Sequence, residues 1–119
     1  MYWTVDFHPA FADEFDDLDE AVQDRLLVGV ELLQEFGPAL GRPHADSLNG
    51  SKHGNMKELQ FRVKNGVWRA AFAFDPHRQA IVLVAGNKVG HNERRFYRTL
   101  IDKADRRYDE HLVRLGKDD

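Results

Sequence analysis

The sequence predicts an α+β fold in which a small twisted antiparallel sheet of about four strands carries an N-terminal helical hairpin and a C-terminal helix. Three patterns predict it: helical periodicity over residues 9–36, alternation of apolar and polar residues around Asn65-Gly66, and helical periodicity again after Asn92. The chain has 119 residues, of which 42% are hydrophobic, so it has the size and the apolar content of one domain. We therefore expect a single domain over residues 1–119.

The first third of the chain predicts a strand followed by two acidic helices. Residues 2–7 alternate apolar and polar side chains, and Pro9 favours the start of a helix. A second helix is expected from Glu20 to Phe36, where Gly37-Pro38 ends it. Its apolar stripe consists of Val22, Leu26, Val30 and Leu33.

The central part predicts a long loop and then two hairpins. Glycines and prolines interrupt residues 37–55, with a short extended piece around 45–48. Residues 58–64 and 67–74 both alternate, and Asn65-Gly66 between them is a strong hairpin signal. Residues 81–85 are all apolar, which is typical of a central strand. Asn92 then caps the final helix.

Charge is distributed unevenly along the chain. The net charge is −3, yet residues 1–51 hold 2 basic and 11 acidic residues, whereas residues 52–98 hold 10 basic and 3 acidic ones. This division predicts a basic working face and an acidic back, although two ordinarily solvated surfaces would give the same counts.

The turn predicts where the basic residues of the sheet lie. If Asn65 and Gly66 are its two central residues, Lys64 faces Val67 and Arg62 faces Arg69 on one side of the sheet. Two facing arginines repel each other, so they form either a socket for a polyanion or two solvated side chains that fan apart. The next hairpin is expected to place Arg69 beside Gly86.

The start of the final helix adds further cations and a ring to this region, namely Arg94, Arg95, Arg98 and Tyr97. Such a set supports phosphodiester binding with base stacking. The alternative is a solvated helix face with acid–base pairs, such as Arg98 with Asp102.

Several motifs in this part of the chain resemble one known family. They are Met56-Lys57-Glu58-Leu59-Gln60-Phe61-Arg62, the strand around Trp68-Arg69, the segment Gly86-Asn87-Lys88, and residues 95–97 and 104–108. Together they resemble the phage-derived, HigB-like branch of the RelE/ParE toxin superfamily. One departure is visible: Gln60 stands where this branch usually has an arginine, so more depends on Arg62 and Arg69.

The resemblance implies a RelE-like fold and a toxin of a type II toxin–antitoxin pair, a ribosome-dependent mRNA endonuclease. The matched catalytic positions are Lys57, Arg62, Arg69, Lys88 and Tyr97. The cations expected to bind RNA around them are Lys64, His91, Arg94, Arg95 and Arg98. The reaction is attack of a ribose 2′-hydroxyl on the adjacent phosphorus, which cations can support without a metal.

The proton-transfer group stays open at this point. Lys57 or Lys88 could serve if neighbouring cations lower its pKa, and His53, Glu58 and His91 are further candidates. Each of the latter also has a structural interpretation. Glu58 would balance a lysine, His91 would belong to a helix-start loop, and His53 would simply be exposed.

Other chemistries find no support in the sequence. There is no cysteine, and therefore no disulfide or thiol catalysis, and the six histidines show no metal-binding spacing. No nucleotide-cofactor motif, signal peptide or membrane-length apolar run is present. We expect no metal, no cofactor and no membrane partner, and a cytoplasmic protein. Trp3 and Trp68 are expected in the core.

Two alternatives to the nuclease stay open: a ParE-like toxin that inhibits a topoisomerase without cleaving RNA, and an inactive RNA-binding relative. The family further implies a helix-turn-helix antitoxin as partner, beside the ribosome and mRNA. The antitoxin would cover either the basic sheet or the acidic helical hairpin.

Overall fold

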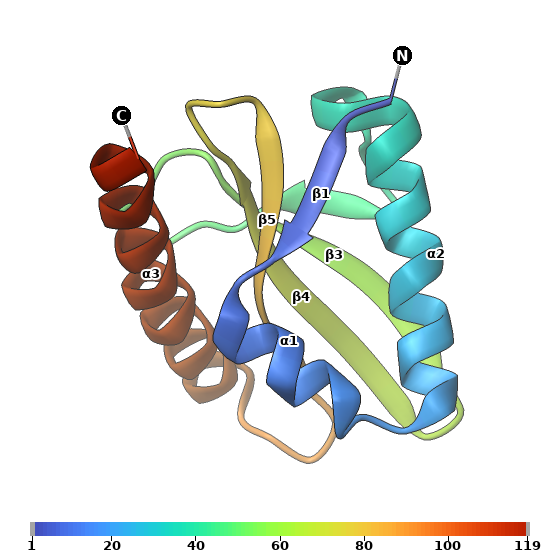
Figure 1. Cartoon of the computed structure of the whole chain (residues 1–119). Coiled ribbons are helices and arrows are strands. Elements are labelled where there is room, and N and C mark those ends of the chain that lie inside the picture. The colour runs from blue at the N-terminus through green and yellow to red at the C-terminus, as the bar shows by residue number, and fades with distance from the viewer. Residues whose placement is uncertain (1, 119) are drawn as a thin grey trace.

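A five-stranded sheet with helices on both faces forms the molecule (Figure 1). The computed structural model describes residues 2–118, with side chains from residue 2 to residue 116. The strands are β1 (Thr4–Phe7), β2 (Ala45–Ser47), β3 (Met56–Val63), β4 (Gly66–Phe74) and β5 (Gln79–Asn87). The helices are α1 (Pro9–Asp16), α2 (Glu20–Phe36), the 3-10 turn η1 (Gly37–Ala39) and α3 (Glu93–Asp118).

The α+β class is confirmed, but the sheet is larger and less regular than expected. Its order is β1-β5-β4-β3-β2, and β1 runs parallel to β5 while the other neighbours are antiparallel. The expectation of about four antiparallel strands was therefore wrong in number and in the direction of β1. The extended piece near residue 45 is the edge strand β2, which pairs with β3 over three residues.

Each face of the sheet buries its own apolar cluster. Helices α1 and α2 cover one face, where Phe11, Leu26, Leu33 and Phe72 are almost fully buried. Helix α3 covers the other face and packs Leu100, Ala104 and Tyr108 against β4 and β5. In Figure 1, α2 and α3 accordingly lie on opposite sides of the sheet. Because helices cover both faces of the sheet, successive residues of one strand contribute to two separate clusters.

Helix α2 has the bounds that its apolar stripe and the Gly37-Pro38 stop predicted. Gly37 has a φ of +56°, which favours glycine, and it lies directly against the indole of Trp3. A Cβ at this position would lie 2.3 Å from Trp3 Nε1. The glycine thus allows β1 to pack tightly against the end of α2.

The β3–β4 turn differs by one position from the expected one. Its central residues are Lys64 and Asn65, and Val63 pairs with Gly66. Asn65 alone supplies the positive φ, at 64°, because asparagine tolerates the left-handed region. Gly66 is needed for space instead, since a Cβ there would lie 2.7 Å from Trp68 Nε1. Each cross-strand partner is consequently displaced by two residues.

Helix α3 is joined to distant parts of the chain by buried and half-buried polar contacts. The guanidinium of Arg107 donates to both carboxylate oxygens of Glu14, at 2.8 and 2.6 Å, and to the Leu83 carbonyl at 2.8 Å. His111 contacts Asp75, and His8 contacts Glu110. These contacts fix the position of α3 on the sheet. None of the described helices is both long and apolar enough to cross a membrane.

We predict that Glu14→Gln lowers the free energy of unfolding by about 1–3 kcal/mol, between the values of exposed and buried ion pairs. The hydrogen bond from Arg107 lowers the pKa of Glu14 below its ordinary value. The stabilisation is therefore present above that ordinary value and is lost as pH falls through the lowered one. Urea unfolding at neutral and at acidic pH measures both effects.

The matched control is Asp13→Asn, an exposed carboxylate on the same helix. Equal stability of Glu14→Gln and Asp13→Asn at neutral pH would show that the Arg107 contact contributes nothing.

Candidate functional site

Three polar side chains from three different elements meet beneath the first turns of α3. Glu58 of β3 accepts a hydrogen bond from the Tyr97 hydroxyl of α3, with 2.9 Å between Oε1 and the hydroxyl oxygen. The same Oε1 lies 3.0 Å from Nε of Arg69 on β4. The side chains of Glu58 and Arg69 are only 6% and 13% exposed. We call these three residues the Glu58 cluster.

Burial sets the protonation behaviour of the Glu58 cluster. It raises the pKa of Glu58, against the opposing effects of the Tyr97 hydrogen bond and the Arg69 charge. Burial, together with the hydrogen bond to Glu58, raises the pKa of Tyr97. The tyrosine therefore remains a phenol that donates its proton to the carboxylate.

The guanidinium of Arg69 is fixed in orientation. Nε donates to the Tyr97 hydroxyl oxygen at 3.2 Å and faces Glu58, while Nη1 donates to the Trp68 carbonyl at 2.9 Å. Within residues 2–116, no hydrogen bond involves Nη2. Because a guanidinium has five N–H donors, Arg69 keeps donors for a ligand while it stays paired with Glu58.

Two further cations lie around the Glu58 cluster. Lys88 Nζ lies 5.7 Å from the centre of the Tyr97 ring and 2.9 Å from Glu93 Oε1. Arg62 is exposed and projects from the same face of the sheet as Arg69, two cross-strand pairs nearer the turn. Four of the five expected catalytic residues, Arg62, Arg69, Lys88 and Tyr97, thus lie on the α3 side of the sheet.

Arg62 and Arg69 do not face each other as the predicted turn required. Arg69 is paired with Gln60, and Arg62 with Val67. The expected pairing was wrong because the turn lies one residue earlier in the chain, although a displacement of two residues keeps each side chain on its predicted face. The expected register of Arg69 beside Gly86 is confirmed.

Lys57 lies apart from the other expected catalytic residues. It pairs with Phe72, so its side chain projects from the face that α2 covers, and its Nζ lies 3.5 Å from the Pro38 carbonyl. The expectation that Lys57 joins Arg69 in one cluster was wrong, because successive residues of a strand point to opposite faces.

The expected RNA-binding cations lie in two places. Lys64 is exposed in the β3–β4 turn, and the others lie at the start of α3, where His91, Arg94, Arg95 and Arg98 are all exposed. Asn92 caps this helix as predicted, because its Oδ1 accepts from the Arg95 amide at 3.1 Å. Among the described residues, Arg98 and Asp102 do not form the ion pair that their spacing allowed. Glu93 pairs with Lys88.

Three structural interpretations of single residues need correction. Glu58 is paired with an arginine and a tyrosine rather than a lysine. His53 is largely buried, with Nε2 lying 2.9 Å from Asp109 Oδ1, so it is neither simply exposed nor near the Glu58 cluster. Trp3 and Trp68 are half-buried, and the Trp68 ring lies parallel to that of Phe61.

The described residues contain no group of three side chains able to hold a metal ion.

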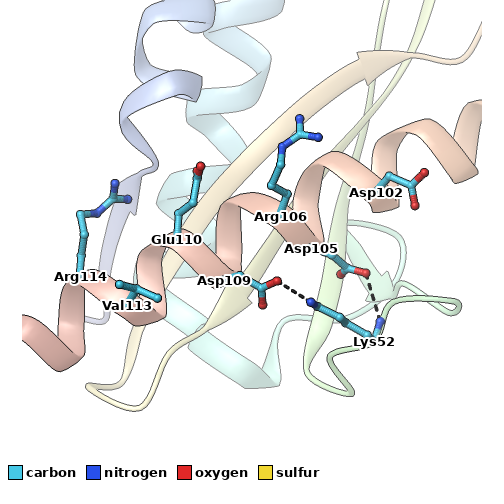
Figure 2. Close-up of a pocket in the computed structure, with 8 residues that line it drawn as sticks. All are labelled: Lys52, Asp102, Asp105, Arg106, Asp109, Glu110, Val113 and Arg114. Atoms are coloured by element: carbon cyan, nitrogen blue, oxygen red, sulfur yellow. Dashed lines mark hydrogen bonds and ion pairs between the residues drawn. The ribbon is translucent and has the colours of Figure 1, made fainter.

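A second charged surface lies on the outside of α3, where Lys52 pairs with Asp109 and its backbone amide donates to Asp105 (Figure 2). Acidic and basic side chains alternate along this open surface, as Asp102, Arg106, Glu110 and Arg114 show. Its charges are of both signs and it carries no buried polar group, which distinguishes it from the Glu58 cluster.

Comparison with known proteins identifies the family. Residues 13–109 match the family described as "Phage derived protein Gp49-like". The chain belongs to this family. It is 42% identical over 115 residues to the Mycobacterium tuberculosis protein named toxin HigB2, and 47% identical over 84 residues to HigB3 of the same organism. These matches cover 95% and 71% of the chain, but 56% of HigB2 and 71% of HigB3.

Two solved structures show that this HigB-type chain has the RelE fold. A mutant of Escherichia coli toxin RelE in the free state matches with a TM-score of 0.61, covering 87% of this chain and 97% of that one. A chain of the archaeal RelE–RelB complex from Pyrococcus horikoshii matches with a TM-score of 0.55, covering 76% of this chain and 100% of that one. Both are 16% identical in sequence, so they establish the shared architecture only.

We predict that Glu58→Gln lowers the pKa of Tyr97, because the variant removes the carboxylate that accepts the phenolic proton and repels a phenolate. Titration of the tyrosine Cζ resonance by NMR measures this shift directly. The control is Glu93→Gln, which removes the partner of Lys88 and leaves the Tyr97 hydroxyl bonded to Glu58. An unchanged Tyr97 titration in Glu58→Gln would contradict the assigned hydrogen bond.

Proposed function

We propose that this HigB-type protein is the toxin of a type II toxin–antitoxin pair and that it cleaves mRNA on the ribosome, in the cytoplasm. Its similarity to two proteins named as HigB toxins supports the toxin assignment. The convergence of Arg62, Arg69, Lys88 and Tyr97 on one face of the sheet carries the nuclease assignment. In this proposal residues 1–119 form one toxin domain.

The proposed reaction requires charge stabilisation at one phosphate. The 2′-oxygen forms a bond to phosphorus as the hydroxyl loses its proton, and the bond from phosphorus to the 5′-oxygen breaks as that oxygen gains one. Between these events the phosphorus carries five oxygens and extra negative charge. Fixed cations stabilise this state more than the ground state, and such contacts contribute about 10²–10³-fold each.

The geometry suggests a role for each cation in this reaction. Arg69 offers its Nη2 amino group to a phosphate oxygen while Glu58 keeps the guanidinium oriented. Arg62 is exposed beside it and contacts the phosphate from the turn side. Lys88, which is held between Glu93 and the Tyr97 ring, is the proposed donor of a proton to the leaving 5′-oxygen.

The proposed partner is a helix-turn-helix antitoxin. One structural neighbour comes from a RelE–RelB complex, which supports a protein partner for this chain. The acidic surface of α1 and α2 lies on the opposite side of the sheet from Arg69. The two sides are thus separate surfaces on which the ribosome-bound mRNA and the antitoxin bind in this proposal.

We predict that Arg69→Lys lowers mRNA cleavage by about 10²–10³-fold, because lysine keeps the charge beside Glu58 but lacks the guanidinium fork. Primer extension on transcripts during induced expression measures cleavage, and circular dichroism checks the fold. Arg25→Ala on α2 is the control, because it removes an exposed arginine from the other side of the sheet. Codon-phased cuts at the wild-type rate by a folded Arg69→Lys variant would contradict the proposal.

Lys57→Ala is predicted to retain cleavage within a few-fold of wild type, since the lysine projects from the face opposite Arg69. The same primer-extension assay measures it. A loss as large as that of Arg69→Lys would mean that RNA reaches the α2 side of the sheet. Intact transcripts together with DNA damage would instead favour a topoisomerase inhibitor.

A further inference from the structure

A groove lies between β5 and the first turns of α3, next to the Glu58 cluster. It has a volume of about 310 Å³ and is lined, among others, by Gly86, His91, Arg95, Phe96, Thr99 and Lys103. This volume is at the lower end of small-ligand pockets and suits a single nucleotide. We call it the β5–α3 groove.

One wall of the β5–α3 groove is a strand edge without a neighbouring strand. β1 pairs with β5 only from Gln79 to Val82, whereas the groove is lined by the later residues Ala85, Gly86 and Asn87. On the other side of this segment, β4 pairs with it in the usual way. The outer edge therefore presents backbone donors and acceptors of the kind that can bind a polar planar ligand.

The opposite wall of the groove is basic. Arg95, Thr99 and Lys103 recur every four residues and so lie along one side of α3, with His91 at its start. The basic side chains of this wall are those of His91, Arg95 and Lys103, and none of them forms an ion pair with another described residue. The charge of Lys103 lowers the pKa of Glu14 without an ion pair between them, and the Glu14 carboxylate is bound by Arg107. The groove thus carries positive charge that the protein itself does not neutralise.

Phe96 separates the β5–α3 groove from the Glu58 cluster. Its ring packs on Gly86, where a Cβ would lie 3.0 Å from Phe96 Cε1, and Gly86 is the cross-strand partner of Arg69. The Phe96 and Tyr97 rings lie 5.3 Å apart at 81°, so one faces the groove and the other faces Glu58. The imidazole of His91 lies 6.3 Å from the Phe96 ring and is tilted by 32°.

We propose that the β5–α3 groove binds the nucleotide adjacent to the phosphate held at Arg69. The base lies against Phe96 and His91 and hydrogen bonds to the β5 edge, while Arg95 and Lys103 contact its own phosphate. A strand crossing from the groove over the Phe96–Tyr97 pair then brings the next phosphate to Arg69. This inference deepens the proposed nuclease function and rests on it.

The test is an NMR titration of the whole chain with adenosine 3′-monophosphate and uridine 3′-monophosphate, without ribosomes. We expect saturable amide shifts at residues 85–87 and 95–103, with millimolar dissociation constants. Inorganic phosphate and unphosphorylated adenosine should each bind at least about tenfold more weakly, because each supplies half of the contacts.

Arg95→Glu is expected to weaken nucleotide binding by at least about tenfold. Its matched control is Arg106→Glu, the same charge reversal on the outer surface of α3, where Figure 2 shows Arg106 among other charged side chains. The control should bind as wild type does. Both substituted arginines are exposed, so each variant is expected to fold.

Three results would overturn the inference: no saturable shifts at the groove, equal loss in both variants, or equal binding of phosphate and nucleotide. These results are distinguishable from a failure of the nuclease proposal. If nucleotides bind in the groove but transcripts stay intact, the cleavage reaction is wrong. If Arg69→Lys abolishes cleavage but nucleotides do not bind the groove, only the subsite is wrong.

Discussion

The contacts of the Glu58 carboxylate determine how the basic face of this protein is built. A buried carboxylate is costly unless charged or polar partners surround it, and here one partner comes from β4 and another from α3. Because Glu58 itself lies on β3, a single oxygen atom joins three elements. The position of Tyr97, the orientation of Arg69 and the seating of the first turns of α3 therefore depend on one another.

The strict sidedness of the sheet explains why the charged residues divide as they do. Alternate residues of β3 and β4 enter different clusters, one beneath α2 and one beneath α3. The acidic hairpin covers the first face, and the cations near Arg69 lie on the second. A chain with a net charge of only −3 thereby presents surfaces of opposite sign, which attract different partners.

Much of the fold could be predicted from local patterns, and the errors have definite physical causes. The bounds of α2 followed from its apolar stripe and the Gly37-Pro38 stop, and the Arg69–Gly86 pairing followed from the second hairpin. The parallel pairing of β1 leaves no local signal, because its partner lies 75 residues away in the sequence. The Glu58–Arg69 contact was not predicted because the turn was placed one residue too late. That register put Arg62 opposite Arg69 and left Glu58 four residues further along β3. The prediction that Lys57 lies beside Arg69 was wrong for a different reason. Alternation along β3 alone places Lys57 and Arg62 on opposite faces of the sheet.

The pairing of Thr4 with Gln79 also bears on how the protein is made. β1 is an edge strand whose neighbour β5 follows 75 residues later in the chain, so the sheet closes only after β5 has been synthesised. Tyr97 and the rest of α3 emerge later still. A nascent chain that does not yet include Tyr97 therefore lacks one of the partners of Glu58, and the Glu58 cluster forms only once α3 has been synthesised.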